Sequence, residues 1–407
     1  MIPTPRRVWA TAALVFVAAA AIYWLSAVHL VGRPHSPDVA YFDQLAGAIL
    51  QGRVHLLNPP SSHDLTFHNG RAYVPFPPLP ALLILPWVAL GGVESVNTVA
   101  FSAAIGGANV SLMFLLLQWL AARGWTHLTV LDNVWLAALF GVGSVHWYMA
   151  TIGSVWLVSQ ICTVMFLLLS VGMAVAGDAP ILCGAAMAAA MLGRPHVALC
   201  YPLLLAIAMQ RTRESEGCEW NRMASWILRS TAPMAATAVA LLAYNWLRFG
   251  DLLDFGYAKQ NVAGRFTESL QTYGLFDSAY IPHNLWTMWI APPLWDGAKQ
   301  RLVPDPEGMS VLLTTPAFVY LARARPRNLV MVGAWLSFGL LLIPLVTYYN
   351  TGWVQFGYRF SLDFMVPVTM LLAFAAGHRV SWPMRGLIVL GVLVNAWGVV
   401  WHGNPDR

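Results

Sequence analysis

The sequence has little charge and little cysteine. Charged residues make up 10% of its 407 residues, against about a quarter in a soluble globular domain, and this excludes an ordinary cytosolic enzyme. Cys162, Cys183 and Cys200 fall in apolar stretches and Cys218 in a charged loop, and no two of them form a closely spaced pair. The sequence therefore indicates neither a disulfide framework nor a zinc site. It also lacks a low-complexity linker and a convincing internal repeat, so we predict one integral membrane domain over residues 1–407.

Apolar residues, in contrast, are abundant and grouped. Hydrophobic residues make up 58% of the chain. We predict an all-α polytopic membrane bundle with about eleven transmembrane helices, because runs of this length cross a bilayer as helices. The predicted spans are residues 8–31, 95–120, 130–147, 154–176, 179–193, 195–210, 229–248, 309–322, 329–348, 359–377 and 383–401. A further run, Leu79 to Leu90, is too short to cross and rich in proline, which predicts an interfacial helix.

The distribution of basic residues predicts the orientation. The net charge is +5, but the basic residues form short clusters between apolar runs rather than one patch, so we expect no nucleic-acid partner. Short cytoplasmic loops are enriched in arginine and lysine. With Arg6 and Arg7 inside, the arginine clusters fall on the inner side, the N-terminus is cytoplasmic, and the loops 32–94 and 249–308 are external. The first apolar run is longer than the core of a signal peptide, so an uncleaved helix is favoured over a cleaved one.

The two external loops hold most of the acids of the chain. Long loops on a rigid scaffold are where function concentrates. In the first loop, Asp38 follows a proline and either caps a predicted helix over residues 39–51 or serves as general base for a hydroxyl acceptor. Asp43 lies about 140° further around such a helix, so the two carboxylates are expected to have different roles.

A short motif later in the first loop predicts a turn. Asn69 and Gly70 form an NG pair between two short stretches, which indicates a β-hairpin. His63, Asp64 and His68 lie close to this turn, but their spacing is not that of a zinc site. Solvated loop residues are the favoured interpretation, so no metal site is predicted here.

Three arginines stand at predicted helix ends. Arg194 lies in a GRPH break between short apolar helices, where it either snorkels to the surface or holds the phosphate of a lipid head group, and the second interpretation is favoured. Arg359 and Asp363 are four residues apart, which predicts an ion pair on one helix face that leaves an edge of the guanidinium for a phosphate. Arg248 stands beside two aspartates, which favours a solvated helix exit.

In the order of these features, the sequence resembles the GT-C superfamily of polytopic glycosyltransferases, in particular bacterial lipid-carrier-dependent members related to protein O-mannosyltransferases and aminoarabinose transferases. The resemblance spans most of the chain. Its features are an acid before an aromatic-containing helix in the external first loop (37–41), the proline-rich FPPLPALLILP (76–86), the GRPH break (193–196) and FGYRFSLDFMVP (356–367).

The resemblance implies a membrane glycosyltransferase in a bacterial-type plasma membrane, with an external active site. Such an enzyme transfers a hexosyl or pentosyl group, with inversion, from a polyprenyl-phosphate-linked donor to a hydroxyl of a lipid, glycan or protein acceptor. Asp38 matches the general base, and Arg194 and Arg359 match positions where cations hold the leaving phosphate. The residues expected to support them are Tyr41, Asp43, His196 and Asp363.

Val39 stands where many relatives carry a second acid, which argues against a divalent metal, and no other cofactor is implied. The first loop, 32–94, is expected to be catalytic, and the second, 249–308, to select the acceptor or act as a lid. The runner-up hypothesis is a transporter or flippase of lipid-linked saccharides, although a transporter places polar residues near the middle of the bilayer. A third is a protein that binds lipid-linked glycan without catalysis. The enzyme hypothesis requires Asp38, Arg194 and Arg359 to converge on one external cavity.

Overall fold

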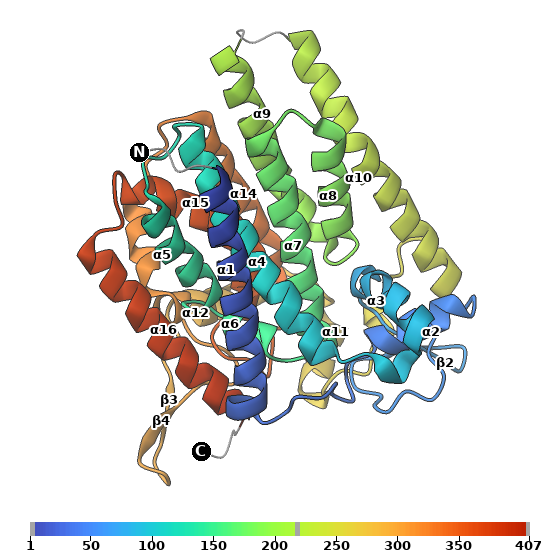
Figure 1. The fold of residues 1–407 in the computed structure, drawn as a ribbon. Helices are drawn as coiled ribbons and strands as arrows, with labels where there is room; N and C mark the ends of the chain where they lie inside the picture. The colour runs from blue at the N-terminus through green and yellow to red at the C-terminus, as the bar shows by residue number, and fades with distance from the viewer. Residues whose placement is uncertain (1–4, 216–219, 404–407) are drawn as a thin grey trace.

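The computed structural model describes residues 5–215 and 220–403, which form a helical bundle with a layer of loops, short helices and two hairpins at one end (Figure 1). This confirms the predicted all-α class. Cys218 lies outside the described residues, and the other three cysteines are buried and unpaired.

Seven described helices are long and apolar enough to cross a membrane on their own. They are α1 with the π-helical turn η1 (Pro5–Leu25, Ser26–Val31), α4 (Thr98–Ala122), α7 (Val155–Ala176), α10 (Trp220–Phe249), α14 (Leu329–Thr347), η8 with α15 (Arg359–Phe364, Met365–Ala376) and α16 (Trp382–Gly403).

Seven of the eleven predicted spans are therefore continuous helices long enough to cross alone. The other predicted spans are short or broken helices: α5 and α6 (Val130–Gly141, His146–Ala150), α8 (Pro180–Met191), η3 and α9 (Pro195–Cys200, Tyr201–Ser215), and α13 and η7 (Val311–Thr314, Pro316–Arg323). Pro180, Pro195 and Pro316 each stand at the start of a new helix. Proline has no N–H to donate to a preceding turn, so it begins helices more readily than it continues them.

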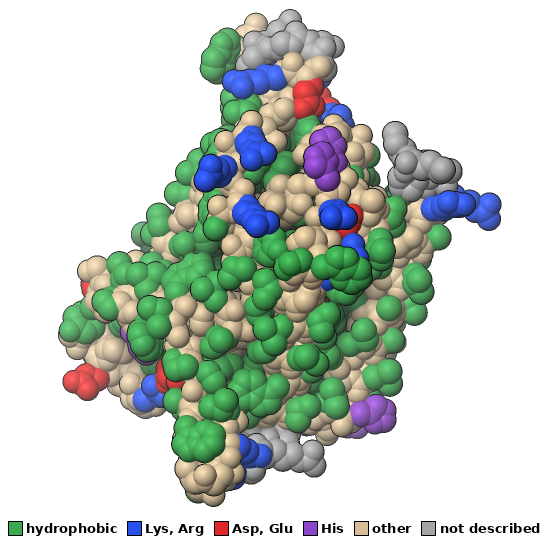
Figure 2. All heavy atoms as spheres, turned by 90° about the vertical axis from the view of Figure 1, so that its left-hand side faces the viewer, with side chains coloured by type: hydrophobic (Ala, Val, Ile, Leu, Met, Phe, Trp, Pro, Cys, Tyr) green, Lys and Arg blue, Asp and Glu red, His purple; other side chains and the backbone are tan. Residues whose placement is uncertain are grey.

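The outer surface of the bundle is apolar. Figure 2 shows hydrophobic side chains over the middle of one face, with arginine and lysine gathered in its upper part. On α10, Leu228, Val239 and Leu247 are all exposed. A surface of this kind is stable only against lipid, and the chain is an integral membrane protein.

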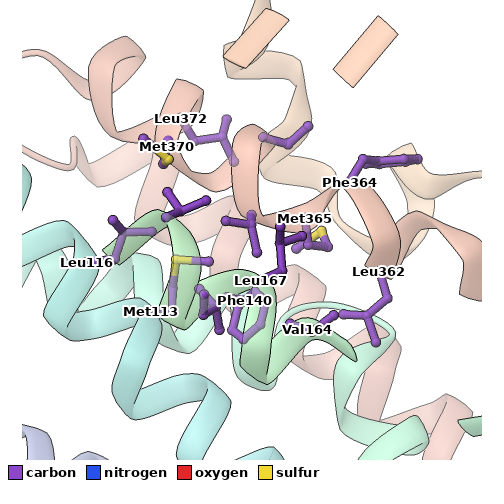
Figure 3. Close-up of a cluster of buried hydrophobic side chains, with 14 of the residues drawn as sticks. Met113, Leu116, Phe140, Val164, Leu167, Leu362, Phe364, Met365, Met370 and Leu372 are labelled. Atoms are coloured by element: carbon purple, nitrogen blue, oxygen red, sulfur yellow. The ribbon is translucent and has the colours of Figure 1, made fainter. Parts of the chain in front are cut away.

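The core lies where α4, α5, α7 and α15 meet. In Figure 3, Met113 from α4, Phe140 from α5 and Leu167 from α7 lie close to Met365 at the start of α15. All four side chains are fully buried. This packing holds the ends of α7 and η8 together, and both contribute to the site described below.

The first loop contains α2 (Phe42–Leu50), the hairpin β1–β2 (Thr66–His68, Arg71–Tyr73), α3 (Leu79–Gly91) and η2 (Val93–Ser95). The predicted hairpin is confirmed, with Asn69 and Gly70 at positive φ in its turn. The expected cap by Asp38 is wrong: α2 is preceded by Tyr41, and no side chain caps it. The chain makes a turn first, in which the Ala40 N–H donates to the Pro37 carbonyl, so Asp38 lies too early to cap the helix.

The second loop covers part of the first. It contains η4 (Tyr257–Lys259), η5 (Gly264–Phe266), α11 (Thr267–Tyr273), η6 (Ser278–Tyr280), α12 (Ile281–Trp289) and the hairpin β3–β4 (Leu294–Asp296, Arg301–Val303). The Thr66 hydroxyl donates to the Gly256 carbonyl at 2.9 Å, and the Asn261 N–H donates to the Leu65 carbonyl at 2.8 Å. The two large loops are thus joined by hydrogen bonds.

Candidate functional site

A cavity of about 540 Å³ lies between the two loops and the ends of the helices beneath them. Its residues come from segments far apart in sequence: the first loop, α7, the α8–η3 break, the second loop, α14 and η8. Its polar and aromatic lining includes His63, Asp64, Trp156, Arg194, His196, Tyr257, Gln260, Tyr348, Tyr349, Asn350 and Arg359. Its apolar lining includes Phe76, Phe255, Leu275, Phe276, Pro344, Leu345 and Phe360.

Arg194 reaches the cavity from the break between α8 and η3. One of its guanidinium nitrogens lies 3.0 Å from Oδ2 of Asp363, and Nε2 of His196 lies 2.9 Å from the same oxygen. Gln160 on α7 donates to the other carboxylate oxygen, Oδ1, at 3.0 Å. Because the Asp363 carboxylate is completely buried, it is a fixed anchor for Arg194 and His196.

The predicted ion pair between Arg359 and Asp363 is wrong. Both residues lie on η8, which is a 3₁₀-helix. In a 3₁₀-helix residues four apart are separated by about 120° and do not share a face. Asp363 therefore turns toward Arg194, and Arg359 toward the cavity.

Arg359 has no carboxylate partner among the described residues. Its Nε is buried without a hydrogen-bond acceptor, as is Nε of Arg194. The two guanidinium carbons lie 5.0 and 5.2 Å from the centre of the same ring, that of Phe360. The cavity thus contains two neighbouring cations, one of them without a carboxylate in contact among the described residues, and such a pair favours an anionic ligand.

Asp64 faces the same cavity, although the sequence favoured a solvated loop residue. Its side chain is 20% exposed, against 49% for His63, because the second loop covers it. Oδ2 accepts a hydrogen bond from the Trp156 indole at 2.9 Å. Burial raises the pKa of this carboxyl, although His63, Trp156 and Arg359 oppose the shift.

Asp38 does not line this cavity. It is exposed and borders a separate polar cleft of about 840 Å³, together with Asp43 and Glu94. Asp43 is 8% exposed, and burial, with a smaller contribution from Glu94, raises the pKa of its carboxyl. Tyr41 is buried. Its hydroxyl donates to the His63 carbonyl at 2.8 Å, and burial raises the pKa of this hydroxyl, with further contributions from Asp64 and Asp38.

The structure therefore unites only part of the predicted set. Arg194, His196, Arg359 and Asp363 come together, whereas Asp38 and Asp43 line a separate cleft. The expected convergence of Asp38, Arg194 and Arg359 on one cavity is therefore wrong. Sequence reasoning missed Gln160, although a buried amide within an apolar run was a signal for it. Asp64 and Trp156 offered no comparable signal, since their pairing joins residues 92 positions apart.

Arg248 was expected at a solvated helix exit and is instead 4% exposed. It donates to the Val74 carbonyl at 2.9 Å and to Asn245 Oδ1 at 2.7 Å. Its guanidinium carbon lies 4.2 Å from the centre of the Tyr244 ring. Because it bonds to the first loop, Arg248 fixes that loop to the end of α10, beside the cavity.

Among residues 5–215 and 220–403, no three His, Cys, Asp or Glu side chains gather in a way that would hold a metal ion. No protein-family model and no curated protein matches the chain.

Two solved structures do resemble it. Crystalline ArnT from Cupriavidus metallidurans bound to undecaprenyl phosphate matches with a TM-score of 0.53 and 16% sequence identity, over 93% of this chain and 62% of that chain. The apo form of the same protein has a TM-score of 0.47 and 14% identity, over 89% of this chain and 59% of that one. This chain thus spans less than two thirds of ArnT. At this level of identity the first match shows a shared fold with ArnT over most of this chain.

Proposed function

We propose that the protein is a membrane glycosyltransferase that uses a polyprenyl-phosphate-linked sugar as donor and transfers it to a hydroxyl acceptor. The observation that carries this proposal is the pair of guanidinium groups in one cavity, of which Arg359 has no carboxylate partner among the described residues. The shared fold with an ArnT structure that contains undecaprenyl phosphate supports the choice of a lipid phosphate.

The transfer step follows from these charges. The bond between the anomeric carbon and the phosphate oxygen breaks, and its electron pair stays on the phosphate. Arg194 and Arg359 stabilise the negative charge that develops there. The acceptor oxygen attacks the opposite face of the anomeric carbon, so the configuration inverts, and its proton goes to a carboxylate acting as general base.

Asp38 is the general base in this proposal. It is exposed on a cleft of the first loop that shares no lining residue with the donor cavity, so this role requires the acceptor hydroxyl to be held between the two. Asp43, in the same cleft, has the supporting role. The reaction needs only one ionised carboxylate on the acceptor side, unlike the paired carboxylates of a glycosidase.

The apolar lining suits the lipid part of the donor. Leu275 and Phe276 from the second loop and Pro344 and Leu345 at the end of α14 all line the cavity. A polyprenyl chain buried there would gain about 25 cal/mol for each Å² removed from water, while its phosphate reaches the arginines. We place the protein in a bacterial-type plasma membrane, with the N-terminus cytoplasmic and this cavity external.

The experiment that tests the proposal is binding of undecaprenyl phosphate to the purified protein in detergent. We expect Arg359→Gln to weaken binding at least tenfold, since a hydrogen bond to a charged group contributes about 1.5 to 3 kcal/mol. Arg71→Gln is the matched control, because Arg71 is exposed on the hairpin outside the cavity, and it should change the affinity less than twofold. Absence of binding by the wild type, or equal effects of both variants, would contradict the proposal.

A further inference from the structure

Asp64 brings an anionic side chain into a cavity that otherwise attracts anions. It is the one described carboxylate on the cavity lining, because Asp363 lies beneath that lining with Arg194 and His196. No guanidinium or ammonium nitrogen among the described residues lies within 4.0 Å of it, and the His63 imidazole Nε2 lies 3.9 Å from Oδ2. Neutralising Arg359 by direct contact is therefore not its role.

One oxygen of this carboxylate is fixed and the other is available. Oδ2 accepts the Trp156 indole N–H at 2.9 Å, which orients the group toward the cavity. Oδ1 has no hydrogen-bond donor among the described residues. Oδ1 is not one of the buried polar atoms without a partner, so it is open to the cavity, where a ligand hydroxyl can reach it.

The backbone around Asp64 is held in an uncommon conformation. Its φ is 57°, a left-handed value that aspartate tolerates better than most residues. The second loop holds it there: the Asp64 N–H donates to the Asn261 carbonyl at 3.0 Å, and the Gln260 side chain donates to the Asp64 carbonyl at 3.2 Å. Strained residues clamped in this way are concentrated in ligand sites.

We propose that Asp64 binds the transferred sugar and selects it. Resting on the proposed function, this assignment places the lipid phosphate on Arg194 and Arg359 and the sugar beside Asp64. Oδ1 accepts hydrogen bonds from sugar hydroxyl groups, and the carboxylate charge stabilises the positive charge that develops at the anomeric carbon. Asp64 neither gains nor loses a proton in this role, so it complements the base on the acceptor side.

The test compares free and sugar-linked carrier. The probes are undecaprenyl phosphate and the same lipid linked to glucose, mannose, galactose or arabinose, each titrated into purified protein. The variant is Asp64→Asn, which keeps an acceptor for Trp156 and suits a left-handed φ, and the matched control is Glu268→Gln, an exposed acid on α11 outside the cavity.

We expect the wild type to bind at least one sugar-linked carrier more tightly than the free carrier. Asp64→Asn should weaken binding of that sugar-linked carrier about tenfold. Binding of free undecaprenyl phosphate by Asp64→Asn should be unchanged or tighter, because a negative charge leaves the cavity. Glu268→Gln should match the wild type with every probe, which excludes a general effect of acid removal.

If Asp64→Asn keeps the full gain for every sugar, or if no sugar adds affinity in the wild type, the assignment of Asp64 is overturned while carrier binding stands. If the wild type does not bind free undecaprenyl phosphate, the proposed function itself fails. Retained binding of free carrier by the variant also shows that it has folded.

Discussion

At the scale of single residues, two carboxylates of the first loop have different surroundings. Asp38 is exposed on the polar cleft, whereas Asp64 is largely covered by the second loop. A general base must reach the acceptor, so exposure suits Asp38. A carboxylate that contacts the sugar interacts with it more strongly where water is excluded, so partial burial suits Asp64.

We predict that Asp38→Asn lowers sugar transfer at least 100-fold, since general-base catalysis contributes about 10²- to 10⁴-fold. Release of sugar from the carrier, measured in membranes, checks this, and undecaprenyl phosphate binding should stay near the wild-type value. Asp251→Asn, at an exposed acid of the second loop, is the control. Undiminished transfer by Asp38→Asn would remove Asp38 from the mechanism.

A second prediction concerns stability and pH. Burial raises the pKa of Asp64 in the folded protein, so protonation of this carboxyl favours folding, and the ionised form present at neutral pH opposes it. Asp64→Asn should therefore unfold at a higher temperature than the wild type at neutral pH. The difference should shrink as the pH falls through the raised pKa. Thermal unfolding in detergent over this pH range checks the prediction, and a lower midpoint for the variant at neutral pH would contradict it.

At the scale of elements, α10 depends on one close helix contact. Much of α10 is exposed, and it packs chiefly against α8. A Cβ atom added to Gly184 on α8 would lie 1.9 Å from the Ser230 carbonyl oxygen on α10. The same residue, Ser230, is hydrogen-bonded through its hydroxyl to Tyr201 at 2.7 Å. Small residues at such contacts let membrane helices approach closely.

We predict that Gly184→Ala destabilises the protein by about 1 to 3 kcal/mol, because the clash involves backbone and the helices must separate. Gly339→Ala on α14 is the matched control, since a Cβ atom there meets nothing within 4 Å. The control should leave the thermal midpoint unchanged or raise it slightly. Equal midpoints for the two variants would show that the α8–α10 contact is not tight.

At the scale of the whole molecule, charge is distributed along one axis. The two large loops lie at the end of the bundle opposite to the N-terminal end of α1 (Figure 1). The arginine-rich connections, such as the one that contains Arg323 and Arg325, are at the other end. This distribution supports the proposed orientation.

We predict that a cysteine at position 278 is reached from outside the cell and one at position 327 is not. Ser278→Cys and Arg327→Cys, both at exposed positions, would be introduced singly into a variant whose native cysteines are serines. A membrane-impermeant maleimide applied to intact cells should label only the first, and both after permeabilisation. Labelling of Arg327→Cys in intact cells would reverse the orientation.

Local sequence patterns were sufficient for some features of this protein. The apolar runs predicted the helices, because the apolar character of a run of residues decides whether it enters lipid. The NG pair predicted the hairpin, because Asn69 and Gly70 readily adopt the positive φ that the turn requires. Arg194 and Arg359 could also be identified from the sequence, because a charged residue beside an apolar run is costly in a membrane and indicates a functional site.

Only the tertiary structure decided the partners of these residues. Asp363 pairs with Arg194 rather than Arg359 because its helix is 3₁₀ and because α7, carrying Gln160, packs against it. Asp64 enters the cavity because a loop nearly 200 positions later covers it. Contacts over such separations depend on how helices and loops pack in space, and the spacing of residues along the chain carries no information about that packing.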